Sequence, residues 1–160
     1  PPRNQNTTSA MEITDSVATI LQHKRQAPVL SVAPQSTVYE AIKLMSEQNI
    51  GCVLVMEGDT LLGILSERDY TRKVVLQGRQ SKSTSVREIM TTDVICVSPQ
   101  HGVEATLRIV TENRVRHLPV KDGDRVIGLI SIGDLVKWVI SAQRSALSQL
   151  EAYVAGGYPG

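Results

Sequence analysis

The stretch Gly63-Ile64-Leu65-Ser66-Glu67-Arg68-Asp69 returns 65 residues later as Gly128-Leu129-Ile130-Ser131-Ile132-Gly133-Asp134. The match extends outward without a gap, so that residues 29–75 align with residues 94–140. A unit this small cannot bury its own apolar face, and two copies of such a unit usually build one pseudo-symmetric domain. The repeat therefore predicts the fold, and the polar residues that stand in both copies are the first candidates for a function.

Each copy predicts the element order β-α-β-β-α. In the first copy a β-rich run over residues 29–32 ends at Pro34, and a helical pattern begins at Val38. Two aliphatic runs, 52–56 and 61–65, then flank Gly58 in a hairpin pattern, and a second helix begins near Ser66. The second copy repeats this order over residues 94–97, 103–110, 118–120 and 126–130, with its last helix beginning near Ser131. We expect an α/β (α+β) fold of two repeats that pack through their sheets.

The organisation along the chain has five parts. We predict a disordered tail over residues 1–14, a first repeat over 15–78, a basic linker over 79–84 and a second repeat over 85–141. Residues 142–160 form a C-terminal helix extension and tail. Each repeat opens with a similar short segment, Ser16 to Leu21 and Ser85 to Met90, which we interpret as a serine-capped single helical turn.

The C-terminal extension carries an apolar stripe of its own. The stripe keeps near-helical spacing up to Gly156-Gly157, through Leu135, Trp138, Val139, Ala142, Ala146, Leu150 and Tyr153. It lies outside both repeats, so it is either a surface for a partner or a helix that folds back on its own domain. The sequence leaves both interpretations open.

Composition excludes several classes of function. The 160 residues carry a net charge of +1, which gives no global field for nucleic acid or membrane, and we expect neither as a partner. No apolar run is long enough to span a bilayer, and residues 1–10 do not resemble a secretory signal. Cys52 and Cys96 do not occupy equivalent repeat positions, so we expect buried free thiols in a reducing compartment. Three scattered histidines give no metal site, and His117 has no second ligand or nucleophile beside it.

The pattern Gly-x-x-Ser-x-x-Asp is the sharpest chemical signal, and it has two interpretations. A hydroxyl and free amides at a helix start can receive a phosphate, and a nearby carboxylate can bind a ribose diol. Ser66 with Asp69, and Ser131 with Asp134, can equally be capping boxes that satisfy the first amides of each helix. Two copies at one offset shift the balance toward ligand binding only in part, because homologous helices would inherit the same cap.

Cationic residues gather near the same strand ends and helix starts. Arg68 and Arg72 share a helix face, and Arg79 and Lys82 lie in the linker. Arg114, Arg116 and His117 lead into the apolar run 118–120. Such a cluster suits a phosphate. The alternative is a solvated face with a weak i,i+4 ion pair between Asp69 and Lys73. The chain has no nucleophile elbow, P-loop, H-E-x-x-H or G-x-G-x-x-G motif, which favours a site that holds a nucleotide without transforming it.

The tandem repeat, with each copy closing on Gly-x-x-Ser-x-x-Asp, resembles a pair of cystathionine β-synthase (CBS) domains, the Bateman module. The resemblance covers about Ser16 to Ile140 and also rests on the serine-initiated segments and on Arg116-His117-Leu118-Pro119-Val120. Residues 66–70 and 78–83 and the Gly-Gly-Tyr tail are similar to a stand-alone subgroup of this family. That subgroup contains small bacterial signal-transduction-like proteins and a plant mitochondrial relative, so we expect a bacterial cytoplasmic protein or, alternatively, a mitochondrial matrix protein.

The resemblance implies a non-enzymatic regulatory sensor of adenine nucleotides. AMP is the expected ligand, with ADP, ATP, NAD(H) or S-adenosylmethionine as alternatives. In the family the motif Asp binds ribose and the motif Ser lies near ribose and phosphate, while strand residues frame the base. The corresponding base-framing positions are Leu30, Gly51, Cys52, Ile95, Arg116 and His117.

The two copies differ where the base would lie. Copy two has Arg116-His117 where copy one has Gly51-Cys52, so we expect two sites that differ in shape and charge. The sequence leaves open whether one site or both are filled. The resemblance also implies a homodimer and an effector protein whose identity is unknown. The alternative from another class is a structural interaction subunit with vestigial nucleotide pockets, and an enzyme acting on nucleotides is the least favoured interpretation.

Overall fold

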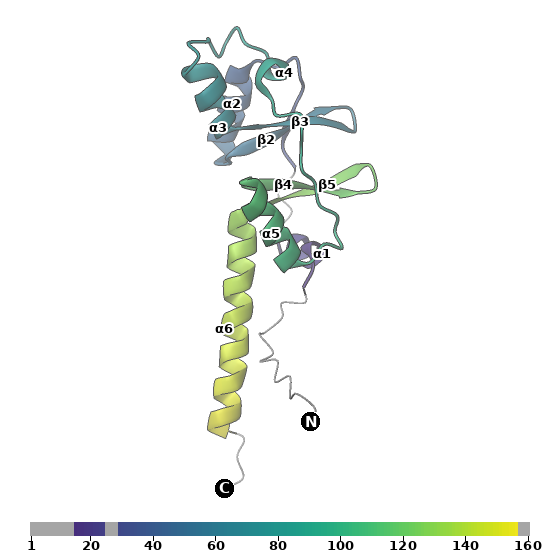
Figure 1. The fold of residues 1–160 in the computed structure, drawn as a ribbon, viewed down its shortest axis with the longest axis vertical. Coiled ribbons are helices and arrows are strands. Elements are labelled where there is room, and N and C mark those ends of the chain that lie inside the picture. The colour runs from purple at the N-terminus through teal and green to yellow at the C-terminus, as the bar shows by residue number, and fades with distance from the viewer. Residues whose placement is uncertain (1–14, 25–28, 157–160) are drawn as a thin grey trace, which may run out of the picture.

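The computed structural model describes residues 15–24 and 29–156. The disordered tail expected over residues 1–14 and the chain beyond Gly156 lie outside the described residues. The two halves stack along the long axis of the molecule, with the two small sheets in the middle and helices on their outer sides (Figure 1). This is the expected α/β arrangement of two repeats that pack through their sheets.

The first half has the predicted order of elements. Strand β1 (Ser31–Val32) pairs in parallel with β2 (Cys52–Glu57), and β2 pairs antiparallel with β3 (Thr60–Ser66). Helix α2 (Val38–Gln48) connects β1 to β2, and the short helix α3 (Glu67–Tyr70) continues as the π-helical segment η1 (Thr71–Val75). Gly58 has a φ of 59° in the β2–β3 turn, a conformation that glycine adopts without a Cβ penalty.

The second half repeats this order with two differences. Helix α5 (Val103–Asn113) leads to the antiparallel pair β4 (His117–Asp122) and β5 (Arg125–Ser131). The strand expected over residues 94–97 is reduced to one parallel bridge, between Val97 and Val120. The last helix, α6 (Ile132–Gly156), is 25 residues long, whereas its counterpart in the first half ends at Val75.

The two short segments that open the repeats exchange partners. Val17 and Ile20 of α1 (Val17–His23) lie in the core of the second half, and Val86 and Ile89 of α4 (Val86–Ile89) lie in the core of the first. The amide of Val17 donates to the carbonyl of His101 at 2.9 Å, and the amide of Val86 donates to the carbonyl of Ser36 at 2.8 Å. The cores therefore do not follow the division at residues 15–78 and 85–141.

The serine-capped single turns are only partly correct. Helix α1 has seven residues rather than one turn, and the side chain of Ser16 makes no capping hydrogen bond. Its first amides instead reach carbonyls of the second half, among them that of Pro99. Ser85 does mark a helix start, because its amide and hydroxyl donate to the Glu88 carboxylate at 2.7 and 3.1 Å.

The basic linker is held against the first half. The amide of Val38 donates to the carbonyl of Thr84 at 2.9 Å, and the amide of Tyr39 donates to the carbonyl of Ser81 at 3.0 Å. These carbonyls satisfy two of the amides that a helix start leaves without a partner in the helix. The buried hydroxyl of Thr84 closes the segment through a 2.8 Å bond to the carbonyl of Gln80. Residues 79–84 thus cover the start of α2.

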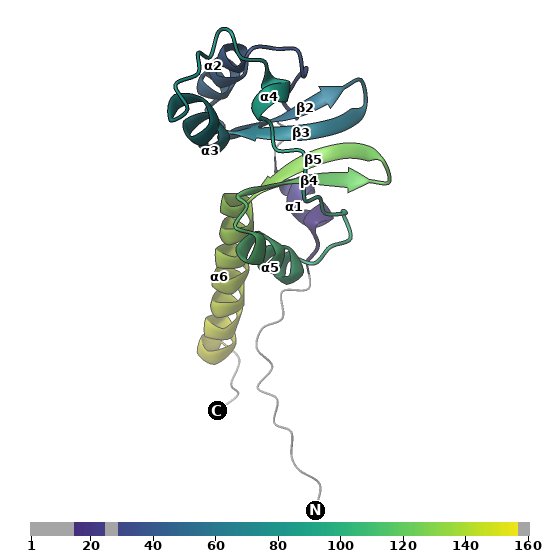
Figure 2. The ribbon, with the colours of Figure 1, turned by 45° about the horizontal axis from the view of Figure 1, so that its top comes forward.

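The C-terminal helix divides into two parts. Leu135 is fully buried, and Trp138, Val139 and Ala142 are half-buried, so the first part packs against the second half as one interpretation expected. From Gln143 onward nearly every residue is exposed, and the helix projects past α5 as a rod (Figures 1 and 2). Among the described residues no helix combines the length and apolar character needed to cross a membrane.

Candidate functional site

A cavity of 420 Å³ lies between the two halves, within the size range of small-ligand sites. The first half contributes the start of β2, the end of β3 and helix α3, while the second contributes the segment between α5 and β4. Predicted residues that line the cavity are Gly51, Cys52, Ser66, Arg68, Asp69, Arg114, Arg116 and His117. The cavity wall also includes residues that sequence reasoning did not single out as site residues: Ile64, Glu67, Thr71, Thr91 and Val115.

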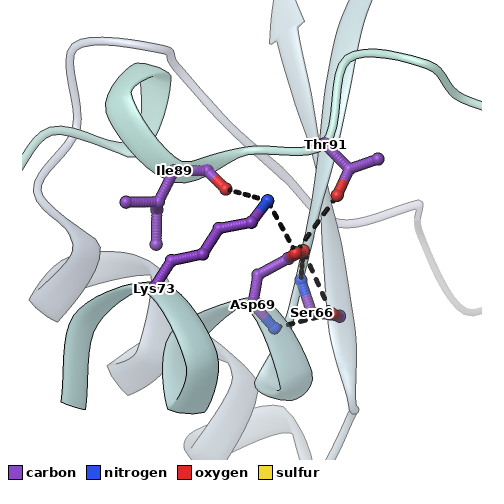
Figure 3. A network of polar contacts seen from close by, with 5 residues as sticks. All are labelled: Ser66, Asp69, Lys73, Ile89 and Thr91. Carbon is purple, nitrogen blue, oxygen red and sulfur yellow. Dashed lines mark hydrogen bonds and ion pairs between the residues drawn. The ribbon is translucent and has the colours of Figure 1, made fainter. Parts of the chain in front are cut away.

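The motif carboxylate Asp69 lies at the centre of a polar network (Figure 3). Its Oδ2 accepts the amide and the hydroxyl of Ser66, both at 3.0 Å. Its Oδ1 accepts the Thr91 hydroxyl at 3.1 Å and pairs with Lys73 Nζ at 3.1 Å. Lys73 also donates to the carbonyl of Ile89 at 3.0 Å, which ties the network to α4.

In this network the motif caps the start of α3, as the capping interpretation predicted. The amide of Asp69 donates to Ser66 Oγ at 3.1 Å, so Ser66 and Asp69 form a reciprocal capping box. A carboxylate has about four acceptor positions, and Asp69 uses four. A ribose diol could reach this carboxylate only by replacing Thr91 or Lys73. The Lys73 side chain is 44 % exposed and is the easier of the two to move.

The predicted asymmetric pairs meet in one cavity. Sequence reasoning assigned Gly51-Cys52 and Arg116-His117 to two different sites, but a Cβ built on Gly51 would lie 3.5 Å from Cε1 of His117. The repeat positions are equivalent in sequence and opposite one another in space. Burial raises the pKa of the Cys52 thiol to about 12, so the thiol in this wall stays protonated.

The cations of the cavity come from both halves. The guanidinium of Arg68 donates to the carbonyl of Arg114 at 3.3 Å, which links α3 to the end of α5. Arg114 has a φ of 52° in this helix-terminating position. Burial lowers the pKa of His117, and the nearby charges of Lys24 and Arg116 lower it further. The carboxylates of Asp134 and Glu67 raise the pKa, but the net shift is downward. His117 is therefore a neutral ring near pH 7.

The second motif carboxylate, Asp134, is engaged differently. Ser131 and Asp134 form the same reciprocal bonds, at 2.9 and 3.0 Å. Lys24, from the other end of the chain, donates to Asp134 Oδ2 at 2.8 Å and to the carbonyl of Leu129 at 2.9 Å. Burial alone would raise the pKa of Asp134, but the bonds from Lys24 and Ser131 outweigh it and lower that pKa. A side chain of the protein thus occupies the place beside this motif.

Aromatic residues lie beside this second motif. Trp138 stands at the repeat position of Lys73, so copy two has an indole where copy one has an ammonium group. Its Nε1 donates to Asp15 at 2.8 Å, and its ring contacts His23 edge-on at a centroid distance of 5.1 Å. The two motifs therefore share a sequence pattern but not an environment.

Both motif glycines allow another part of the chain to approach closely. A Cβ on Gly63 would lie 2.7 Å from the carbonyl oxygen of Thr91, and one on Gly128 would lie 2.9 Å from Cδ2 of Leu21. The sequence left open whether backbone or ligand approaches these positions. At Gly63 it is the backbone after α4, which bridges to Ile64 by two hydrogen bonds.

Several predicted site residues do not line the cavity. Leu30 and Ile95 pack against the two cores. Arg72 is exposed on η1, Arg79 pairs with Glu88 at 3.2 Å, and Lys82 lies 4.9 Å from the ring centre of Tyr39. Ser131 and Asp134 belong to the second motif. The cavity thus brings Arg68 together with Arg114 and Arg116, while Arg72 and the two linker cations lie outside it.

Within the described part of the chain no group of His, Cys, Asp and Glu could hold a metal ion. The cavity wall combines the carboxylates Asp69 and Glu67 with hydroxyls and three arginines, so it offers cations for an anionic group and acceptors for hydroxyl groups. The predicted free thiols are present, although Cys96 is only partly buried.

Comparisons with known proteins agree with this architecture. The family model described as the CBS domain matches residues 17–76 and 86–141. The mitochondrial CBS domain-containing protein CBSX3 of Arabidopsis thaliana is 45 % identical over 127 residues, which are 76 % of this chain and 62 % of that protein. A protein with CBS domains from Burkholderia ambifaria superposes with a TM-score of 0.77 at 52 % identity, over 80 % of this chain and 96 % of that one.

A more distant structure shares the fold alone. It is a CBS domain pair in complex with 5′-methylthioadenosine and S-adenosyl-L-methionine, 23 % identical, with a TM-score of 0.71 over 81 % of this chain and 98 % of that one. Two family-model matches that together cover well over half of the sequence decide the family. The chain belongs to the CBS domain family and carries two CBS domains.

Proposed function

We propose that the protein is a non-enzymatic regulatory module that binds a phosphorylated adenine nucleoside in the cavity beside Asp69. The observation that supports this proposal is the composition of the cavity wall, which contains the motif carboxylate Asp69, the Thr91 hydroxyl bonded to it, and the three arginines Arg68, Arg114 and Arg116. Ligand binding would change the packing between the two halves, which both line the cavity, and so change the affinity for an effector protein.

The assignment of ligand groups follows from charge. Asp69 and Thr91 offer an acceptor and a hydroxyl for a ribose diol once Lys73 has moved aside. The guanidinium groups supply the cations that a phosphate needs, and the neutral His117 ring in the cavity wall can stack on a base or hydrogen-bond to it. The CBS domain pair solved with 5′-methylthioadenosine and S-adenosyl-L-methionine supports an adenosine ligand for this fold. We favour AMP over ADP, ATP, NAD(H) and S-adenosylmethionine.

We further propose one nucleotide per chain. Lys24 bonds to Asp134 and to the Leu129 carbonyl, so the second motif is satisfied from within. At the first motif the carboxylate reaches Lys73 on its own helix, and the cavity opens beside it. Gly51-Cys52 and Arg116-His117 are therefore different parts of the wall of one site. The two motifs differ in their ability to bind a ligand because Lys24 already pairs with Asp134.

A second candidate is an interaction subunit whose nucleotide pocket is vestigial. The observation in its favour is that Asp69 already uses its four acceptor positions inside the protein. On this hypothesis the motif is a structural cap alone, and the function lies on the surface.

Titration calorimetry and thermal unfolding with AMP, ADP, ATP, NADH and S-adenosylmethionine separate the two candidates. Ligand at one hundred times its Kd stabilises the folded state by roughly 2.7 kcal/mol. For a domain of this size that energy raises Tm by roughly 5–10 °C. We expect such a shift with at least one adenine nucleotide and a stoichiometry of one. If none of the five compounds shifts Tm, the sensor proposal fails and the interaction subunit stands.

Asp69→Asn and Asp134→Asn form a matched pair of variants. Each weakens a capping box and an ion pair with a lysine, so the stability of both variants is measured beside their nucleotide affinity. The sensor proposal expects nucleotide affinity to fall at least tenfold for Asp69→Asn and to stay within twofold for Asp134→Asn. Equal affinity in both variants would show that the motif carboxylate does not bind ligand.

The proposed assembly and compartment extend the same argument. We propose that the protein is a homodimer, as the resemblance to its family implies, and that the nucleotide changes its affinity for an effector protein. The Arabidopsis relative is mitochondrial, which supports the mitochondrial alternative, and the Burkholderia structure comes from a bacterium. Fractionation of the native host decides between the two compartments.

A further inference from the structure

Helix α6 carries a second apolar stripe, which begins beside the domain, continues along the projecting part, and is distinct from the face that packs on the domain. Its exposed apolar residues are Val136 and Ile140, each 43 % exposed, Leu147 and Leu150, 54 and 56 % exposed, and Val154, 70 % exposed. With Gln143 they follow each other at intervals of four, three, four, three and four residues. This is the spacing of the contact positions of a coiled coil. We call these six residues the α6 seam.

The α6 seam continues where the domain gives no support. Leu135, Trp138, Val139 and Ala142 face the second half, and beyond them the helix runs to Gly156 without a buried residue. Both views show this part extending away from α5 (Figures 1 and 2). Isolated helices of roughly 12–15 residues are marginal in water, and most gain their stability from packing of an apolar face. The projecting part of α6 therefore needs a partner that packs against the seam and stabilises the helix.

We propose that the α6 seam is an interface between two copies of this chain, in which the two α6 helices pair antiparallel. The spacing of the seam reads the same in both directions. When Val136 lies opposite Val154 of the partner subunit, Ile140 lies opposite the partner's Leu150. In the same register Gln143 lies opposite the partner's Leu147, so that every seam residue lies opposite a seam residue of the other helix. The proposal does not depend on the nucleotide site.

Charge selects the antiparallel orientation. Lys137 and Glu151 each follow a seam residue, and so flank the seam on the same side. The antiparallel register places Lys137 next to Glu151 of the partner subunit, and the two-fold axis repeats this pair. Arg144, also on this flank, lies near its own copy at the centre, where the like charges oppose one another. Parallel pairing would set these charges beside the apolar positions Ile132, Val139 and Ala146 of the other helix and form no ion pair.

The mass of the full-length protein in solution tests the interface. Sedimentation velocity compares the wild type with Leu147→Asp on the seam and Ser148→Asp on the exposed neighbouring face. We expect Leu147→Asp to halve the particle mass at micromolar concentration and Ser148→Asp to leave it unchanged. Nucleotide affinity, measured on the same samples, should be equal in all three. An equal mass for wild type and Leu147→Asp overturns the proposal, and the nucleotide titration stands or fails separately.

Cross-linking tests the orientation. Chains with Val136→Cys and chains with Val154→Cys are mixed under reducing conditions and then oxidised, with the wild type as the control for Cys52 and Cys96. We expect the mixed disulfide as the main product, and each variant alone should cross-link poorly. Lys137→Glu should weaken the dimer at least tenfold, and Lys137→Glu with Glu151→Lys should restore it. Disulfides between identical variants, or no restoration by the double exchange, overturns the antiparallel arrangement.

Discussion

At the scale of single residues, the two motif aspartates show how one pattern acquires two environments. Asp69 takes its cation from Lys73, one helical turn away, whereas Asp134 takes Lys24 from a distant part of the chain. Local spacing predicts the first pair, because residues four apart share a helix face. Nothing local predicts the second, since it depends on the packing of α1 against β5 and α6.

The motif glycines give a matched prediction about stability. We expect Gly63→Ala to cost about 1–3 kcal/mol of unfolding free energy, because its Cβ would meet a backbone oxygen that cannot move alone. Gly128→Ala should cost less, since its Cβ would meet the mobile end of the Leu21 side chain. Urea unfolding of both variants measures the difference. A larger loss for Gly128→Ala would contradict this account of the packing.

His117 gives a prediction about pH. Its pKa is lowered in the folded protein, so the unfolded chain binds more protons in the range between the two values. The contribution of a neutral His117 is therefore fully present above the unfolded pKa of about 6.5 and is lost as the pH falls through the folded value. Unfolding measured from pH 7.5 to pH 5.5 should show a steeper loss for the wild type than for His117→Gln. Parallel curves would refute the assignment.

At the scale of elements, equivalent sequence positions produce unequal helices. After Ser66 the chain forms α3 and η1 and then turns at Gly78, which has a φ of 67°. After Ser131 no glycine or proline follows the first helical turn before Gly156, so α6 runs for 25 residues. Helix length is thus set by breakers in the sequence, and it is this difference that creates the α6 seam.

The buried residues of α2 and α5 follow the helical period. Val38, Ala41 and Met45 are buried on α2, and Val103 and Val110 are buried on α5. The stripe expected on α6 is buried at Leu135 and half-buried as far as Ala146, and it is exposed beyond that residue. The seam runs beside this stripe and shares only Leu150 with it. The helical period identifies the apolar face of a helix, but it does not say over what length the rest of the domain packs against that face.

At the scale of the whole molecule, the exchange of α1 and α4 joins the halves into one structure. Each short helix contributes two buried residues to the core of the other repeat. The first amides of α2 also donate to carbonyls just before the second repeat, and the first amide of α5 donates to a carbonyl at the start of the first repeat. A half that is cut at the repeat boundary therefore loses part of its core and keeps a helix that has nothing to cover.

Fragments of the chain test this exchange. Residues 29–92 contain the complete first core, including Val86 and Ile89, whereas residues 15–78 lack both. We expect fragment 29–92 to unfold cooperatively below the Tm of the full chain, because domains of this size are marginal. Fragment 15–78 should show no cooperative transition by circular dichroism. The exchange would be unimportant if both fragments unfolded with the same midpoint and steepness.

The sequence alone determined the duplication, the order of elements and the residues of the motif. These follow from periodicity, turn residues and a constant offset, which are local properties that any segment carries with it. The fold class and eight cavity-lining residues could therefore be predicted before any coordinates were known.

Only the tertiary structure decided which of these residues act together. It placed Gly51-Cys52 and Arg116-His117 in one cavity rather than two, set Lys24 on Asp134, and carried α1 and α4 across to the opposite cores. These contacts join residues far apart in the chain, and their energies depend on burial and distance in the packed molecule. A repeated motif therefore specifies two similar caps, while the packing of the halves makes one of them a candidate binding site.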